Sequence, residues 1–217
     1  MTFDLDPVQC RVLGCLVEKD LATPEYYPLT LNALTNACNQ KSNREPVMHL
    51  DETDVLQALD VLRKHQLAHQ SAEGIRAVKF CHNLTGRLNL DPEEMAVLTE
   101  LLLRGPQTVG ALRSRAMRMC DVGDLQAIET LLQNLIDRED PLVVKLPRQP
   151  GRKDPRFMHL LAGEVMVDAS PPVPATYDRA STNDSTRILR LEKDLAALQN
   201  DLDNLRRQLH DFKAQFD

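Results

Sequence analysis

The stretch LDPVQCRVLGCL at residues 5–16 recurs as LDPEEMAVLTEL at residues 90–101, and this repeat decides the fold. In both copies the aspartate suits the N-cap of a helix and the proline suits its first position. The glutamine or glutamate three residues after the cap can reach back to the cap backbone. Apolar residues then recur at three- and four-residue spacing, which predicts that each helix buries one face.

Two further helices are predicted in each copy. The second helix reads TLNAL at residues 30–34 and TVGAL at 108–112. The third reads LQALD at 56–60 and LQAIE at 125–129. The matching order of apolar residues indicates that a whole three-helix module is duplicated.

Each third helix leads into two short extended runs, which predict a hairpin. The paired runs are residues 67–70 with 75–80, and 142–146 with 157–161. Three helices followed by a hairpin is the order of a winged helix-turn-helix. The predicted fold class is therefore mainly α with small β-hairpins: two tandem winged helix-turn-helix domains, at residues 1–85 and 86–167, plus a C-terminal coiled-coil helix.

The last 50 residues differ from the repeat. Residues 168–186 are rich in Pro, Ser, Thr and Asp and predict a flexible linker. Residues 187–217 predict a helix whose only apolar positions are the a and d positions of about four heptads. The seam residues predicted to oligomerise are Ile188, Leu191, Leu195, Leu198, Leu202, Leu205, Leu209 and Phe212.

This narrow seam favours a homodimeric coiled coil. Leucine at both a and d does not fix the number of strands, so a trimer stays open. The alternative is a helix docked on the winged-helix domains, which usually shows a wider apolar stripe.

Several motifs carry a family resemblance. CNQKSNREPVM at residues 38–48 is the most specific, with TPEYYPL at 23–29, LLLRG at 101–105 and LRSR at 112–115. Together they resemble the YceH-like family, bacterial proteins of unassigned function, over nearly the whole chain. The resemblance implies a tandem winged-helix fold and supplies no reaction, ligand or partner.

The charge balance opposes general binding to nucleic acid. The net charge is −6, with −3 in residues 1–85, −1 in 86–165 and −2 in 166–217. Any contact with phosphates must therefore come from local patches of cations.

The strongest local patch is predicted in the second copy. The loop at residues 147–156 carries four basic residues and one acidic residue, and its Pro and Gly residues suit an exposed wing tip. Arginines on the second helix add to this charge and would give a steep salt dependence. The predicted contacts to duplex DNA are Arg113, Arg115, Arg118, Arg148, Arg152, Lys153 and Arg156. The alternative is a solvated basic loop that only maintains solubility.

In the first copy Lys41, Asn43 and Arg44 lie between the second and third helices, where the motif approaches a duplex. The alternative is structural: the polar groups satisfy the backbone of an irregular turn, and Arg44 pairs with Glu45. The third helices begin with acidic residues, which would repel phosphates unless turned aside. The first hypothesis is a dimeric DNA-binding protein, a regulator or nucleoid-associated factor, in which the second copy's arginines and wing contact the backbone. Acidic third helices suit the second hypothesis, a protein–protein adaptor that faces a basic partner.

The sequence predicts no enzyme, cofactor or metal site. The six histidines are scattered, no triad or glycine-rich phosphate loop is present, and the five cysteines form no C-x-x-C pair. They are expected to be reduced thiols. Apolar runs are too short for a membrane span and no signal peptide precedes them, so the expected location is the cytoplasm.

Overall fold

Helix α1 (Pro7–Ala22) of the computed structural model begins after Asp6, as the sequence predicts. One Asp6 carboxylate oxygen accepts hydrogen bonds from the backbone N of Val8 and Gln9, both at 2.8 Å. Helix α5 (Pro92–Arg104) repeats this start: the Glu94 carboxylate accepts from the Asp91 backbone N at 3.1 Å. Both predicted helix starts are confirmed.

The structure describes residues 3–71, 77–148 and 154–163. The chain divides into two compact units, at residues 1–167 and 168–217. The predicted linker and coiled-coil helix, with all eight seam residues from Ile188 to Phe212, lie outside the described residues. Both predicted winged-helix domains fall within the first unit, which we treat as a first half (residues 1–85) and a second half (residues 86–167).

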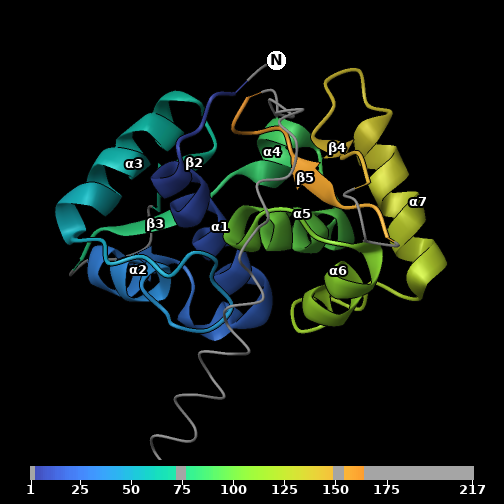
Figure 1. Cartoon of the computed structure of the whole chain (residues 1–217). Helices are drawn as coiled ribbons and strands as arrows, with labels where there is room; N and C mark the ends of the chain where they lie inside the picture. The colour runs from blue at the N-terminus through green and yellow to red at the C-terminus, as the bar shows by residue number, and fades with distance from the viewer. Residues whose placement is uncertain (1–2, 72–76, 149–153, 164–217) are drawn as a thin grey trace, which may run out of the picture. The chain divides into compact units, whose positions relative to one another are not determined.

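The two halves have similar element orders (Figure 1). The first half contains α1, the 3-10 helix η1 (Pro24–Tyr26), β1 (Leu29–Thr30), α2 (Leu31–Cys38), α3 (Glu52–Lys64), β2 (Ala68–Gln70) and β3 (Lys79–His82). A short helix, α4 (Leu84–Leu88), leads on to the second half. The second half contains α5, α6 (Val109–Ala116), α7 (Leu125–Ile136), β4 (Val143–Lys145) and β5 (Phe157–His159).

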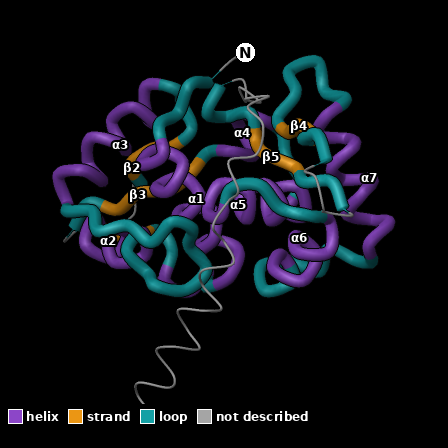
Figure 2. Tube along the Cα trace, in the orientation of Figure 1, coloured by secondary structure: helices purple, strands orange, loops and turns teal. Residues whose placement is uncertain are grey.

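Both predicted hairpins are present as small antiparallel strand pairs (Figure 2). The order of the first sheet is β1–β3–β2, and β4 pairs with β5. Strand β1 was not predicted, because two residues carry no periodicity of their own. Its counterpart in the second half is an isolated bridge between Gln107 and Phe157. This mainly helical fold with small strand pairs is compatible with the winged helix that the sequence predicts.

Helices α1 and α5 pack against each other in the interior of the unit. Residues Cys10–Glu18 of α1 and Glu94–Leu103 of α5 are buried without interruption. The prediction that each helix buries only one face is therefore wrong, because each first helix is covered by its own half on one side and by the other first helix on the opposite side.

Two backbone hydrogen bonds also join the halves. The Leu5 backbone N donates to the Leu161 carbonyl at 2.9 Å, and the Glu45 N donates to the Leu103 carbonyl at 2.9 Å. One hydrophobic core runs through both halves. We therefore expect the described residues of both halves to behave as a single body.

Gly14 lies where α1 closely approaches α5. A β-carbon at this position would lie 2.8 Å from the Leu103 Cδ2 and 3.2 Å from the Leu102 Cβ. We expect Gly14→Ala to lower the free energy of unfolding by about 1–3 kcal/mol, since overpacking a well-filled core outweighs the gain in helix propensity. Urea denaturation would measure it.

Gly110 of α6 provides the matched control, because a β-carbon there meets nothing within 4 Å. Gly110→Ala should raise the free energy of unfolding by about 0.5–1 kcal/mol through helix propensity alone. If Gly14→Ala raised the free energy of unfolding as Gly110→Ala does, the close packing of α1 on α5 would be contradicted.

Candidate functional site

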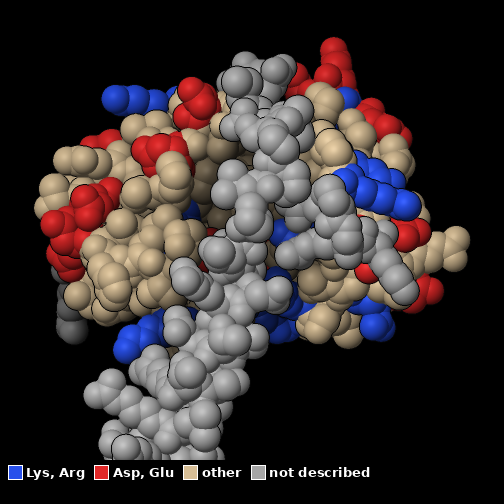
Figure 3. Space-filling model, viewed as in Figure 1, with Lys and Arg blue, Asp and Glu red and all other residues tan. Residues whose placement is uncertain are grey.

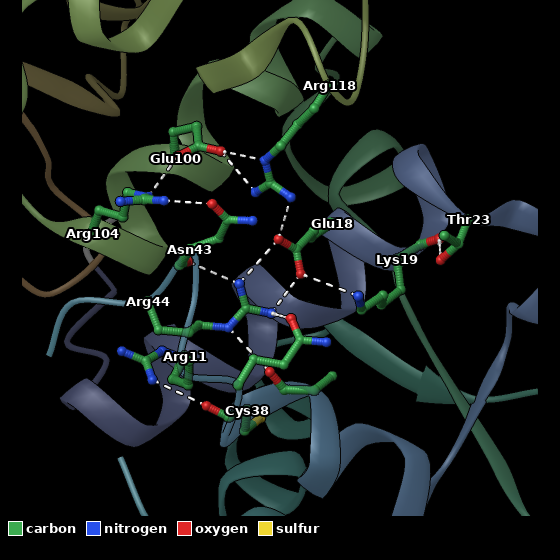
Figure 4. Close-up of polar contacts among 12 residues, drawn as sticks. Arg11, Glu18, Lys19, Thr23, Cys38, Asn43, Arg44, Glu100, Arg104 and Arg118 are labelled. Atoms are coloured by element: carbon green, nitrogen blue, oxygen red, sulfur yellow. Dashed lines mark hydrogen bonds and ion pairs between the residues drawn. The ribbon is translucent and has the colours of Figure 1, made fainter. Parts of the chain in front are cut away.

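A cluster of arginine and glutamate side chains, buried except at Arg118, joins the two halves (Figure 4). Glu18 comes from α1 and Glu100 from α5, and their side chains are 1% and 0% exposed. Arg44 comes from the segment between α2 and α3, and Arg118 from the residues after α6. We call these four residues the junction cluster.

Arg44 binds Glu18 with both ends of its guanidinium group. Its Nη1 donates to Glu18 Oε1 at 3.0 Å and its Nη2 to Glu18 Oε2 at 2.5 Å. The Nε donates to the Ala37 carbonyl at 3.1 Å. The Nη1 also donates to the Asn43 carbonyl and the Nη2 to the Gln40 side chain, so that five hydrogen bonds, two of them charge-assisted contacts to the carboxylate, satisfy the buried guanidinium group.

Arg118 bridges the two carboxylates. Its Nη1 lies 2.6 Å from Glu18 Oε1 and its Nη2 lies 2.8 Å from Glu100 Oε1. Burial raises the pKa of the Glu18 carboxyl, but the Arg44 and Arg118 guanidinium groups lower it more, so the net shift is downward. Glu18 is therefore held as a carboxylate that binds an arginine from each half.

Most polar residues of the segment 39–46 serve the fold. Asn43 accepts a hydrogen bond from Arg104 Nη2 at 2.5 Å. Asn39 pairs with the Leu50 backbone through both its amide nitrogen and its amide oxygen. Of the residues predicted here to contact DNA, Asn43 and Arg44 are thus engaged in the interior, and Lys41 is exposed. The predicted Arg44–Glu45 pair is replaced by the pair with Glu18.

The structure separates the three arginines predicted on the second helix. Arg118 lies beyond α6, which ends at Ala116, and so the prediction that it belongs to the second helix is wrong. Arg115 is half-buried and donates to the Gln107 side chain. Arg113 is exposed, and its Nε donates to the Gly123 carbonyl at 2.9 Å, just before α7.

The β4–β5 hairpin presents further cations. Lys145, at the end of β4, and Arg148 are both exposed, whereas Arg156 is half-buried with a buried Nε. Arg152 and Lys153 lie outside the described residues. Lys145 was not among the predicted contacts, although the alternation of β4 places it outward.

Helix α7 packs beside β4 and exposes a face rich in amides. Gln126, Thr130, Gln133 and Asn134 are exposed there, with Glu129 as the one acidic residue of α7 among them. The acidic residues at its start are used locally. Asp124 accepts from the Ala127 backbone N at 2.8 Å and Asp121 from the Gly123 N at 3.1 Å.

Helix α3 of the first half has the opposite character. Asp51, Glu52, Asp54 and Asp60 are exposed along it. Figure 3 shows acidic side chains gathered over the start of α3, whereas on the side of β4, β5 and α7 Lys and Arg side chains are interspersed with Asp and Glu. The start of α3 thus presents more carboxylates than the exposed face of α7.

Sequence reasoning missed Glu18, Glu100 and Arg104. The available signal was a charged residue within or directly after an apolar run: Glu100 lies within residues 95–103, and Glu18 directly follows residues 12–17. A solvated side chain at either place would interrupt the core. The sequence alone could not say which arginines would meet them.

Some kinds of site are not found where the structure describes the chain. In residues 3–71, 77–148 and 154–163, no three His, Cys, Asp or Glu side chains lie close enough to hold a metal ion. None of the helices described there is both long and apolar enough to cross a bilayer. All five cysteines are free thiols.

Comparison with known proteins places the chain among close bacterial relatives. A family profile described as "Protein of unknown function, DUF480" matches residues 5–152. A UPF0502 protein of Geobacter metallireducens is 54% identical over 217 residues, covering 98% of each chain. UPF0502 proteins of Geotalea uraniireducens and Geotalea daltonii are 52% and 54% identical over 219 residues, covering 100% of each chain.

Proposed function

The chain belongs to the UPF0502 family, described by the DUF480 profile, and from that starting point we propose that it is a non-enzymatic protein that binds duplex DNA through its second half. The family resemblance expected from residues 38–48 is confirmed. The family names assign no ligand, so the proposal is argued from the exposed residues of α6, α7 and the β4–β5 hairpin.

One observation carries the proposal: exposed cations flank an exposed helix face rich in amides. Lys145 and Arg148 lie on the hairpin side and Arg113 lies beside the start of α7. Cations neutralise phosphates, and glutamine and asparagine side chains suit hydrogen bonds to base edges. Because Asp121 and Asp124 are engaged with backbone N–H groups, they oppose DNA less than free carboxylates would.

The proposed architecture is two tandem winged helices and a coiled coil that pairs two chains. The repeated order of three helices and a strand pair supports the first part. The seam of residues 188–212 supports the second. Pairing matters because one half, with few exposed cations among its described residues, should bind weakly. Sedimentation equilibrium should give the mass of a dimer. A monomer at all protein concentrations would contradict the proposed pairing of two chains through the coiled coil.

Fluorescence anisotropy with a labelled 30-base-pair random duplex, from about 50 to 300 mM KCl, tests DNA binding. We expect Lys145→Gln/Arg148→Gln to weaken binding roughly tenfold and to reduce the slope of log affinity against log salt by about 2. The cause is the loss of two phosphate contacts.

Arg63→Gln/Lys64→Gln is the matched control, because it removes the same two charges from exposed positions at the end of α3. Both double variants have the same net charge, so a general field effect would weaken them equally. Equal weakening would remove the assignment to the second half. No binding by the wild-type protein at 50 mM KCl would remove DNA binding altogether.

The exposed acidic residues of α3 favour a second function, that of a protein–protein adaptor. Carboxylates at the start of a third helix repel phosphates and attract a basic partner. The two functions are compatible, since they use different halves of one body. Their tests are independent.

A further inference from the structure

An open groove lies between α3, the start of α2 and the β2–β3 hairpin, with a volume of about 440 Å³. Its apolar lining includes Leu31, Leu56, Val78 and Phe80. Leu56 and Val78 are 42% and 57% exposed, although neither belongs to a flexible chain end. The groove is therefore a surface where apolar area stays in contact with water.

Two exposed apolar side chains share this groove, out of six large ones that are exposed among the described residues. Isolated exposed apolar residues are ordinary, whereas adjoining ones in a concave surface are typical of a binding site. A partner side chain seated between Leu56 and Val78 would remove apolar surface from water.

The charged residues around the groove are acidic and favour a partner that carries basic residues. Glu52 lines it and is held across it by Asn32, whose Nδ2 donates to Glu52 Oε1 at 3.3 Å. Asp51 and Asp54 are exposed nearby on the start of α3, where acidic side chains dominate the surface in Figure 3. Of the described lining residues, none is Lys or Arg.

We propose that this groove docks a peptide segment of a partner protein, one that carries an aliphatic side chain flanked by lysine or arginine. The aliphatic side chain contacts Leu56 and Val78, and the cation contacts Glu52. An open groove suits an extended or helical segment better than a small molecule, which needs a more enclosed site. The inference rests on the adaptor function proposed above and is independent of DNA binding.

Anisotropy of labelled seven-residue peptides with the full chain tests the proposal. The basic apolar peptide KLKVKLK should bind at least tenfold more tightly than its acidic form ELEVELE and its polar form KSKTKSK. Leu56→Ser/Val78→Ser should weaken this binding at least tenfold. Glu52→Gln should weaken it less and reduce its salt dependence.

Leu125→Ser is the matched control, because Leu125 is the equivalent leucine of the repeat and is 52% exposed. The groove would not be the binding site if Leu56→Ser/Val78→Ser left the binding of KLKVKLK unchanged, or if Leu125→Ser weakened it equally. The acidic adaptor surface would remain as the proposed binding site in that case. No binding of any basic peptide would overturn both. A change of oligomeric state in Leu56→Ser/Val78→Ser would overturn the partner assignment, because the groove would then join two copies of the chain.

Discussion

Glu18→Gln is expected to lower the free energy of unfolding by about 3–5 kcal/mol, the range for removing one partner of a buried ion pair. Glutamine keeps the shape of the side chain, so little of this loss comes from a cavity. The cause is that Arg44, whose side chain is 0% exposed, keeps its charge without its carboxylate. Arg118 loses one of its two carboxylates as well. Urea denaturation followed by circular dichroism at pH 7.5 would measure the loss.

Two further variants separate charge from shape. Glu25→Gln, on the exposed η1, should change stability by less than about 0.5 kcal/mol. Glu18→Leu/Arg44→Met should lower the free energy of unfolding less than Glu18→Gln alone, because it also removes the arginine that Glu18→Gln leaves unpaired. If Glu18→Gln lowered the free energy of unfolding by less than about 1 kcal/mol, the buried Glu18–Arg44 ion pair would not stabilise the fold as proposed.

Lowering the pH from 7.5 to 4.5 should cost the wild-type protein about 2–3 kcal/mol more than the His159→Gln variant. His159 in β5 is buried, and its Nδ1 has no hydrogen-bond partner among the described residues. Burial lowers the pKa of its imidazole from an ordinary value of 6.5 to about 4. The measurement is urea denaturation of both proteins at several pH values.

The direction follows from proton binding. Between pH 6.5 and 4 the unfolded chain protonates His159 and the folded chain does not, so stability falls as the pH falls, by about 1.4 kcal/mol per unit. Glu18 affects stability at lower pH. The pKa of its carboxyl in the folded chain lies below the ordinary 4.5, so the stability that it contributes is complete above pH 4.5 and is lost as the pH falls further. Parallel pH profiles for wild type and variant above pH 4.5 would show that His159 is not buried in a neutral form.

The parts of the fold that local chemistry controls could be predicted from the sequence. Asp6 and Asp91 start their helices because capping involves residues only two or three positions away. The mutual burial of α1 and α5 could not be predicted, since it depends on segments about 85 positions apart. Apolar periodicity alone does not reveal whether a second face is also covered.

The sequence predicted that the candidate site consists of cations, but it could not predict which of the arginines belong to it. Charge and exposed loops pointed to Arg113 and Arg148, which are exposed. The same signal also selected Arg44 and Arg118, because a sequence does not show which arginine meets a buried carboxylate. Leu56 of the groove was missed, since an apolar residue at helical spacing resembles any other core position.

The α1–α5 contact and the junction cluster are expected to make both halves one cooperative body, so that the proposed DNA surface and the proposed peptide groove keep a fixed relation. Native-state hydrogen exchange tests it most directly. The slowest amides of α3 and α7 should open with free energies that agree within about 1 kcal/mol, and Glu18→Gln should lower both together. Amides of α7 that open independently of α3, at a free energy unaffected by Glu18→Gln, would contradict it.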